Sequence, residues 1–275
     1  MDRLLYLEIV HERESLTSLQ MTSEILTLEK KGRKEEITEK EIENRNPNIN
    51  KRLRDLNRLG ILDDKEGEYS LSPIGFLILD ELKRLKLNIR VLHKHRHFFD
   101  DHDYTVIPSQ QFREIHKLQY AEQCKDALEY GKIIEENTAK TRHKIRIVTD
   151  RLHDIPGWIR QELREGHLAL DLVYQFRKPF EKNSDDQDEQ ELWNEIVLKD
   201  LPTVELRYLS LEDRNPIGIR IIDEDWAILN FFNISEGILD RSKSFHGIQV
   251  QFVHWVENLF SSIWSFSKEL EVNNL

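Results

Sequence analysis

Apolar residues recur at helical spacing over the first sixty positions of the chain. The pattern indicates an opening helix around residues 4–10 and a second helix around residues 25–28. Ile49, Leu53 and Leu56 fall at i, i+4 and i+7, so they share one side of a further helix. This part of the chain is therefore expected to form several short helices around a common apolar core.

Capping residues set the limits of these helices. Thr38 is followed three residues later by Glu41, which is the spacing of a capping box and predicts a short helix at this point. Asn46 and Pro47 then predict a break. We expect Asn46 to cap a new helix over about 47–59, with Pro47 in its first turn, because the N–H that proline lacks has no partner there.

A hairpin and a long helix follow. Residues 60–71 indicate a helix end at a glycine, a polar turn and a returning strand, and Ser72 and Pro73 then begin a helix of many turns. Helix, turn, helix, hairpin and capped helix in this order are typical of a winged helix-turn-helix. We predict such a domain over residues 1–72 and a linker or dimerisation helix over residues 73–99.

Strand and helix patterns alternate in the remainder of the chain. Residues 144–150 and 168–176 have strand patterns on either side of a helix at 158–164. This βαβ unit favours a mostly parallel sheet, since strands joined by a crossover helix run in the same direction. A further strand is expected at 204–209.

The last hundred residues add a loop, a hairpin and a closing helix. The acidic stretch 181–191 indicates a solvated loop, and residues 217–222 and 226–232 indicate a hairpin. Residues 248–270 carry an apolar stripe that suits a helix docked on the sheet. The expected fold class is mixed α/β: the N-terminal winged helix-turn-helix is followed, over residues 100–275, by an effector-sensing α/β domain.

Charge bears directly on the choice of partner. The 275-residue chain has a formal net charge of −11, which by itself argues against binding to nucleic acid. DNA responds to the local field within about one Debye length, roughly 10 Å, rather than to the total charge. Residues 45–58 are locally cationic, with Asp55 as the one acid among Arg45, Lys51, Arg52, Arg54 and Arg58.

The predicted helix over 47–59 therefore has the features of a major-groove reader. Arginine and lysine pair with guanine, and asparagine pairs with adenine. We expect the chain to bind double-stranded DNA through one cation of the hairpin and six residues in or next to this helix: Arg45, Asn48, Asn50, Lys51, Arg54, Arg58 and Lys65. The alternatives are a solvated helix face or a surface that binds another protein.

Histidines are concentrated after the long helix. His93 and His97 are one helical turn apart, and His95 and His102 lie close by among aspartates. Two histidines at this spacing can ligate a metal ion. A polar helix end with histidines near its negative dipole explains the same residues, so no metal site is predicted.

Short motifs after residue 98 resemble those of a known family. The first set is His102-Asp103, Ile107-Pro108 and Ile115-x-x-Leu118, and the second is Gly237-x-x-Asp240, Gly247, Trp255, Glu257 and Leu259-Phe260. In this order they resemble the regulatory domain of archaeal winged helix-turn-helix transcriptional regulators of the methanogenesis-regulator type, over nearly all of 98–268. The resemblance implies a transcription factor with a phospholipase-D-like α/β sensor. The acidic 181–191 stretch and the acidic hairpin depart from that pattern.

The usual catalytic motifs are missing from the sequence. No histidine is followed two residues later by lysine, as phospholipase-D chemistry needs, and no Gly-x-Ser-x-Gly, P-loop or Gly-x-Gly-x-x-Gly motif occurs. We therefore expect a regulator with no catalytic residues and no cofactor, a hydrolase being the less favoured alternative.

Ligands of parallel sheets bind beyond the carboxyl ends of the strands. That rule nominates Asp150, Gln175 and Tyr208 as contacts for a small-molecule effector. We expect a homodimer paired through the long helix, so that an effector changes the spacing of two DNA-binding helices.

Two observations bear on location. No apolar run approaches the roughly 20 residues needed to cross a bilayer, and no secretory signal is recognised at the N-terminus. Cys124 is the one cysteine, so no internal disulfide can form. We expect a cytoplasmic protein.

Overall fold

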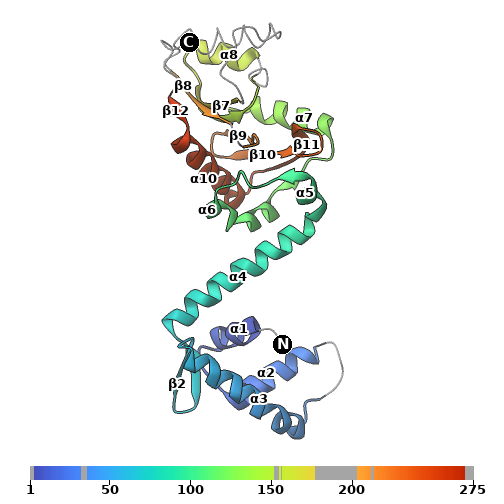
Figure 1. The fold of residues 1–275 in the computed structure, drawn as a ribbon, viewed down its shortest axis with the longest axis vertical. Coiled ribbons are helices and arrows are strands. Elements are labelled where there is room, and N and C mark those ends of the chain that lie inside the picture. The colour runs from blue at the N-terminus through green and yellow to red at the C-terminus, as the bar shows by residue number, and fades with distance from the viewer. Residues whose placement is uncertain are drawn as a thin grey trace. The chain divides into compact units, whose positions relative to one another are not determined.

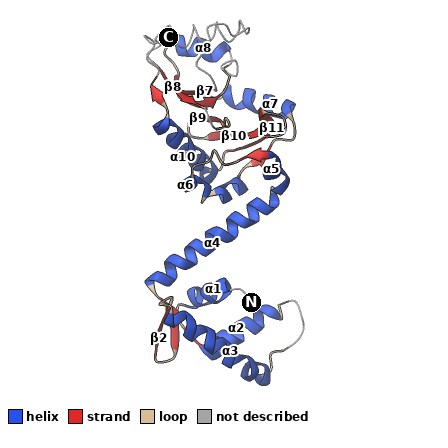
Figure 2. Ribbon diagram, in the orientation of Figure 1, coloured by secondary structure: helices blue, strands red, loops and turns tan. Residues whose placement is uncertain are grey.

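A computed structural model of the chain describes residues 3–31, 36–151, 155, 157–176, 203–211 and 214–269 (Figure 1). The chain divides into two compact units, Met1–Leu87 and Asn88–Leu275. Helices and strands are both abundant (Figure 2), which confirms the mixed α/β class. The predicted loop 181–191 lies outside the described residues. The predicted three-part division, with a separate linker over 73–99, stays a prediction.

The N-terminal unit contains the elements of a winged helix. In chain order they are α1 (Arg3–Arg13), β1 (Leu16–Thr17), α2 (Ser18–Glu29), α3 (Glu39–Arg58), β2 (Leu62–Lys65), β3 (Glu68–Leu71) and the start of α4 (Pro73–Lys94). The three strands pair antiparallel in the order β1-β3-β2. Leu7, Met21, Ile25 and Leu53 are buried in one core that unites the three helices with the sheet.

Helix α3 differs from the prediction. The capping box of Thr38 and Glu41 is present, but the helix that begins there continues without a break to Arg58. Pro47 lies inside the helix with its side chain exposed to solvent, and Asn46 does not cap. Asn46 Oδ1 instead accepts a 3.4 Å hydrogen bond from the Thr22 hydroxyl of α2. Packing on α2 therefore outweighs the local tendency of proline to begin a new helix.

The C-terminal unit is built on a nine-stranded sheet. Its strands are β4 (His102–Asp103), β5 (Glu122–Gln123), β6 (Lys144–Thr149), β7 (Ala169–Phe176), β8 (Val204–Ser210), β9 (Gly218–Ile222), β10 (Trp226–Asn233), β11 (Ile238–Gly247) and β12 (Lys268–Glu269). The order is β12-β8-β7-β6-β9-β10-β11-β5, and β4 pairs with β10 outside this path.

The expected mostly parallel sheet requires correction. Strands β6, β7 and β8 pair parallel, as the predicted βαβ unit requires. All other pairings among the described strands are antiparallel. The reason is the connections, since β9, β10 and β11 follow one another through short turns, and a short turn can join only antiparallel strands.

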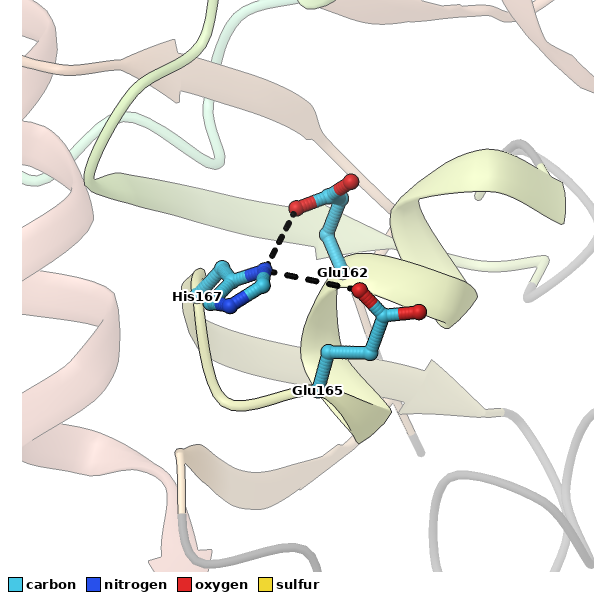
Figure 3. A group of neighbouring side chains, drawn as sticks. All are labelled: Glu162, Glu165 and His167. Atoms are coloured by element: carbon cyan, nitrogen blue, oxygen red, sulfur yellow. Dashed lines mark ion pairs between the residues drawn. The ribbon is translucent and has the colours of Figure 1, made fainter.

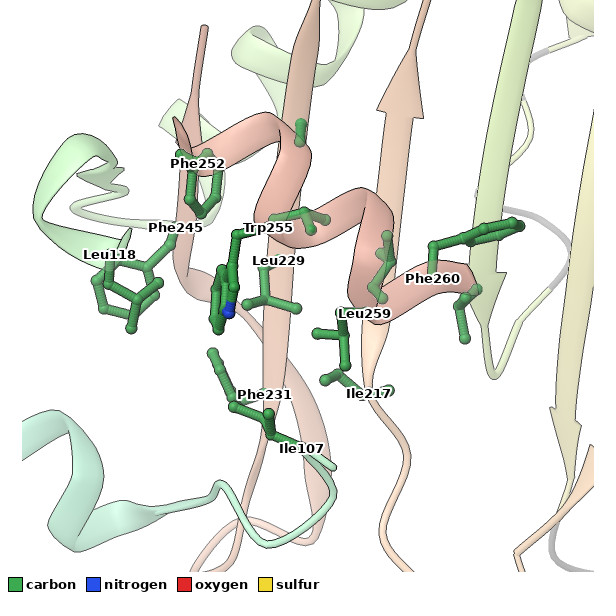
Figure 4. Packing of buried hydrophobic residues seen from close by; sticks show 14 of the residues in the cluster. Ile107, Leu118, Ile217, Leu229, Phe231, Phe245, Phe252, Trp255, Leu259 and Phe260 are labelled. Carbon is green, nitrogen blue, oxygen red and sulfur yellow. The ribbon is translucent and has the colours of Figure 1, made fainter. Parts of the chain in front are cut away.

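Helices cover both faces of this sheet. On one face lies α10 (Val250–Phe266), whose Phe252, Trp255 and Leu259 pack on the sheet in the largest core of the unit. Figure 4 shows the Trp255 ring pointing from α10 toward Leu229 and Phe231. The opposite face carries α8 (Gly157–Arg164) and α7 (Ala127–Thr138), which pack on separate apolar clusters.

Short elements complete the unit. The predicted long helix ends at Lys94, and α5 (Arg96–Asp101) leads directly into β4. Helix α6 (Ser109–Phe112) and the 3-10 helix η1 (Ile115–Tyr120) lie against α10, where the Gln111 carbonyl oxygen accepts a 2.9 Å hydrogen bond from the Trp255 indole. None of the described helices is both long and apolar enough to span a bilayer.

Candidate functional site

Helix α3 presents a cationic outer face. Its inner side buries Ile49, Leu53 and Leu56, and the side chains of Lys51 and Arg54 are exposed on the outer side. Neither cation forms an ion pair with a residue that the structure describes. Arg58 lies on the same side, 3.7 Å from Asp55 and with its side chain 78% exposed. This face therefore offers uncompensated positive charge to a partner.

The other predicted DNA contacts of α3 have different surroundings. Arg45 forms an ion pair with Glu29 of α2. Asn48 is exposed and Asn50 half-buried, and both lie in the middle of α3 because the helix starts at Glu39. A helix that began at residue 47 would have placed both asparagines in its first turn, and the structure does not place them there.

The first turn of α3 is fixed by its capping box. Thr38 donates its backbone N–H to the Glu41 carboxylate at 2.9 Å, and its hydroxyl and the Lys30 ammonium donate to the same oxygen. These bonds, the backbone one above all, lower the pKa of Glu41 to about 2. The carboxylate remains charged at the positive end of the helix dipole, where it stabilises the start of α3.

A concave surface lies beside α3. A cavity of about 550 Å³ is lined by Tyr6 of α1 and by Asn48, Lys51, Arg52 and Asp55 of α3. The Arg52 guanidinium donates to the Tyr6 hydroxyl at 3.3 Å and lies 5.7 Å from the centre of its ring. Asn48 and Lys51 thus border a groove, whereas Arg54 lies on the convex part of the helix surface.

The hairpin of β2 and β3 carries the last predicted DNA contact. Lys65 is exposed at its tip, where Glu66 and Gly67 form the turn with φ values of 56° and 87°. Both residues need the left-handed conformation of a tight hairpin turn. Lys65 is surrounded by acids here, so its charge is largely offset.

A second cavity lies in the C-terminal unit. It measures about 350 Å³ and is lined by residues at the ends of β6 and β7, among them Asp150, Arg151, Tyr174 and Gln175. The structure therefore brings together two of the three residues nominated for an effector, Asp150 and Gln175. Tyr208 is half-buried on β8, paired with Lys268 of β12, and does not line the cavity.

The histidines predicted to cluster do not share one environment. His93 and His97 are exposed, His95 is half-buried, and His102 is fully buried in β4. Within the described residues, one group of three potential metal ligands comes together, and it consists of Glu162, Glu165 and His167. Figure 3 shows both carboxylates directed at one ring nitrogen of His167, with distances of 3.3 and 3.5 Å. Their surface position accounts for them as ordinary ion pairs.

Cys124 has the environment of an inert thiol. It is buried next to α7, and this burial, assisted by the nearby Glu129 charge, raises its pKa to about 11. A thiol with this pKa is protonated at neutral pH and is a poor nucleophile.

Comparisons with known proteins give matches among solved structures. No protein-family model matches the chain, and no curated protein matches its sequence. TrmBL2, an archaeal chromatin protein whose structure shows a novel mode of DNA binding, is 11% identical, with 94% of this chain and 89% of TrmBL2 covered and a TM-score of 0.39.

Two further matches concern about half of the chain. Nuc from Salmonella typhimurium, a phospholipase D family member, is 12% identical, with 51% of this chain and 90% of Nuc covered and a TM-score of 0.37. Phosphatidylserine synthase from Haemophilus influenzae is 14% identical, with 55% of this chain and 38% of the synthase covered and a TM-score of 0.39.

These matches correct one prediction. The missing sequence motifs led us to expect that the chain is not an enzyme, yet the similar structures include enzymes of the phospholipase D family and a phospholipid synthase. The lack of a familiar catalytic motif therefore does not exclude catalysis, and the prediction that the chain is not an enzyme is wrong.

Proposed function

We propose that the chain is a DNA-binding transcription regulator of the archaeal methanogenesis-regulator type, which binds duplex DNA through the outer face of α3. The observation that carries the proposal is the pair of exposed cations Lys51 and Arg54, which have no ion-pair partner among the described residues. In a winged helix this is the helix that enters the major groove. Cations that are not already paired gain most from phosphate contacts, because they lose no internal partner.

The contacts divide by their position on α3. Lys51, Arg54 and Arg58 are the proposed phosphate and base contacts. Asn48, which borders the cavity beside α3, is proposed to contact a base edge. Arg45 has Glu29 as a partner and acts by orienting α3 against α2. Lys65, among acids at the tip of the hairpin, contributes little to affinity.

Pairing of two copies through α4 is part of the proposal. Ile74, Leu77, Leu85 and Ile89 are each more than half exposed. They lie within one third of the helix circumference, since 11 residues are close to three turns. Apolar side chains in such a row are typical of a helix that pairs with another helix.

The charges of α4 favour an antiparallel pair of copies. Within the chain, Arg84 forms ion pairs with Asp80 and Glu81, and Lys86 pairs with Glu8. Arg90 and Lys94, near the end of the helix, form no ion pair with a described residue. Antiparallel pairing keeps these two cations of one copy away from those of the other. Sedimentation of the Leu77→Lys/Leu85→Lys variant tests the pair: it is expected to be monomeric, whereas the control Leu128→Lys, at an exposed leucine of α7, stays dimeric.

An effector completes the proposed mechanism. A small molecule in the cavity of the C-terminal unit stabilises one arrangement of the dimer, and α4, which both units share, passes the change to α3. The free energy available for regulation equals the difference in effector affinity between the two arrangements.

Fluorescence anisotropy with labelled duplex DNA tests the DNA-binding claim. The Lys51→Ala/Arg54→Ala variant is expected to bind at least tenfold more weakly than the wild type, a loss of about 1.4 kcal/mol or more. Lys132→Ala/Lys140→Ala removes the same charge from the exposed surface of the C-terminal unit and serves as the matched control. Equal losses in the two variants would mean that α3 is not the DNA-binding surface and would favour a protein-binding winged helix.

A further inference from the structure

The cavity of the C-terminal unit is lined by a buried glutamine whose amide nitrogen has no hydrogen-bond partner among the described residues. Gln175 is 2% exposed and lines this cavity, and its Oε1 accepts a 3.0 Å hydrogen bond from the Ile217 N–H. Because an N–H can only donate, this bond fixes the amide oxygen toward Ile217. The amide nitrogen then forms no hydrogen bond within the described part of the chain, and a buried donor in that state favours a ligand that can accept.

Among the described residues, the charge at the cavity is positive on balance. Asp150 is paired with Arg241, whose guanidinium lies 3.3 Å from Asp150 Oδ1. Arg151 also lines the cavity and is exposed, and its side chain forms no ion pair with any residue that the structure describes. A ligand that enters the cavity therefore meets the Asp150 carboxylate, whose charge Arg241 neutralises, and the Arg151 guanidinium, which has no ion-pair partner among the described residues. This combination favours an anionic group.

The remaining walls are apolar. Leu211, Pro216 and Phe232 are buried residues of the lining, and Ile238 stands at its edge. A volume of about 350 Å³ is at the lower end of the range of small-molecule sites, roughly 300–1,000 Å³. A bare inorganic anion would leave most of this apolar surface without contacts.

We infer that this cavity binds a small organic acid that has one carboxylate and an apolar body. The carboxylate is held by the Arg151 guanidinium and the Gln175 amide nitrogen, and the apolar part packs on Leu211 and Phe232. This ligand class is the effector of the regulator proposed above, so its regulatory meaning, though not its binding, rests on that proposed function.

The position of the cavity suits a regulatory site. Phe232 pairs with Asp103 in the ladder between β10 and β4, and the next residue, Asn233, pairs with His102. Strand β4 follows directly on α5, which follows α4. A ligand that contacts Phe232 therefore contacts a residue of β10 that pairs with β4. Strand β4 ends the segment that runs from α4 through α5.

Isothermal titration of the full chain with 3-phenylpropionate tests the inference. The acid is expected to bind, and its uncharged amide, which has the same shape, is expected to bind at least tenfold more weakly. Arg151→Ala is expected to weaken binding of the acid at least tenfold, and Lys140→Ala, which removes an exposed cation elsewhere on the unit, changes it less than twofold. Gln175→Glu keeps an acceptor for the Ile217 N–H but replaces the donor with a second carboxylate, and it too is expected to weaken binding at least tenfold.

Three results would overturn the inference. The first is equal binding of acid and amide, or no effect of Arg151→Ala. The second is binding of inorganic phosphate or acetate as tightly as 3-phenylpropionate, which would reduce the cavity to a simple anion site. The third is no binding of any member of the series benzoate, phenylacetate, 3-phenylpropionate and indole-3-acetate at millimolar concentration. DNA affinity of the ligand-free wild type is measured in parallel, so that failure here is distinguished from failure of the proposed function.

Discussion

His102 and Asp240, which are 138 residues apart in the chain, form a buried pair with His102 Nε2 3.0 Å from Asp240 Oδ2. The other ring nitrogen, Nδ1, lies 2.7 Å from the Phe98 carbonyl oxygen, and the Phe98 ring stacks on the imidazole at 4.0 Å. Burial alone raises the pKa of Asp240, but hydrogen bonds from Ser242 and His102 outweigh it and lower the pKa, so this carboxylate is ionised. Both ring nitrogens of His102 thus lie within hydrogen-bonding distance of an oxygen, which fixes the orientation of the ring between β4 and β11.

Substitution of Asp240 is expected to destabilise the C-terminal unit strongly. Asp240→Asn removes the carboxylate that contacts His102 and accepts from Ser242, and it leaves a buried imidazole facing a neutral amide. Loss of one partner of a buried hydrogen bond to a charged group costs about 3 kcal/mol, measured as the change in the free energy of unfolding in urea. Asp225→Asn, at an exposed aspartate of the β9–β10 turn, is the control and is expected to change the same quantity by less than about 0.5 kcal/mol. If Asp240→Asn is as stable as this control, the pair does not hold β4 to β11.

Acid is expected to destabilise the unit through Asp223. Burial alone raises the pKa of this residue, but the backbone N–H groups of Lys144, Arg142 and His143 donate to its carboxylate and lower the pKa overall. Because the pKa is lower in the folded protein, the stabilisation is complete above the unfolded value of about 3.9 and is lost as the pH falls through the folded value.

Urea unfolding between pH 6 and pH 3 measures this effect. Asp223→Asn is expected to be less stable than the wild type at pH 6 and to lose less stability on acidification. Asp225→Asn, two residues away, is expected to follow the wild type. Parallel pH profiles of the wild type and Asp223→Asn would show that the three N–H bonds do not favour the charged carboxylate.

The prediction and the structure differ at Pro47, which lies inside α3 and not in the first turn of a separate helix. Inside a continuous α3 the proline removes the hydrogen bond to the Glu43 carbonyl, and a proline in a helix interior costs about 3 kcal/mol relative to alanine. Pro47→Ala is therefore expected to raise the free energy of unfolding by roughly 1–3 kcal/mol. Asn44→Ala on the same exposed side reports the effect of alanine alone, about 0.5 kcal/mol. A Pro47→Ala variant no more stable than Asn44→Ala would place Pro47 in the first turn of a separate helix, as the sequence indicated.

Local patterns identified most of the elements, and contacts between distant segments explain the differences. Two features of α3 could be predicted because each depends only on residues within two helical turns. They are the capping box of Thr38 and Glu41 and the apolar stripe of Ile49, Leu53 and Leu56. The continuity of α3 depends on Thr22 and the packing of α2, which no local pattern contains. The antiparallel direction of β9 and β10 follows from the short turn between them, which the hairpin pattern in the sequence does indicate. The prediction of a mostly parallel sheet is wrong because it applies the direction of the βαβ strands to every strand of the sheet.

The candidate cavity shows the same division. Asp150 and Gln175 were found from the rule that ligands bind at the carboxyl ends of strands, and both line the cavity. Tyr208 lies on the neighbouring strand β8, paired with Tyr174 of the cavity lining, but is not itself part of that lining. Phe232 and Ile238 could not be found in this way, since they come from the antiparallel part of the sheet.

The dependence of DNA affinity on salt tests the central claim most directly. The wild type is titrated against one duplex at several salt concentrations, and the slope of log K against log salt is compared with that of Lys51→Ala/Arg54→Ala. Each phosphate contact adds about −0.9 to the slope, so the variant's slope is expected to be shallower by about 1.8 for each copy of the dimer that contacts the duplex. The Lys132→Ala/Lys140→Ala control keeps the wild-type slope. Equal slopes for the wild type and Lys51→Ala/Arg54→Ala, or no DNA binding by the wild type at low salt, would contradict the account.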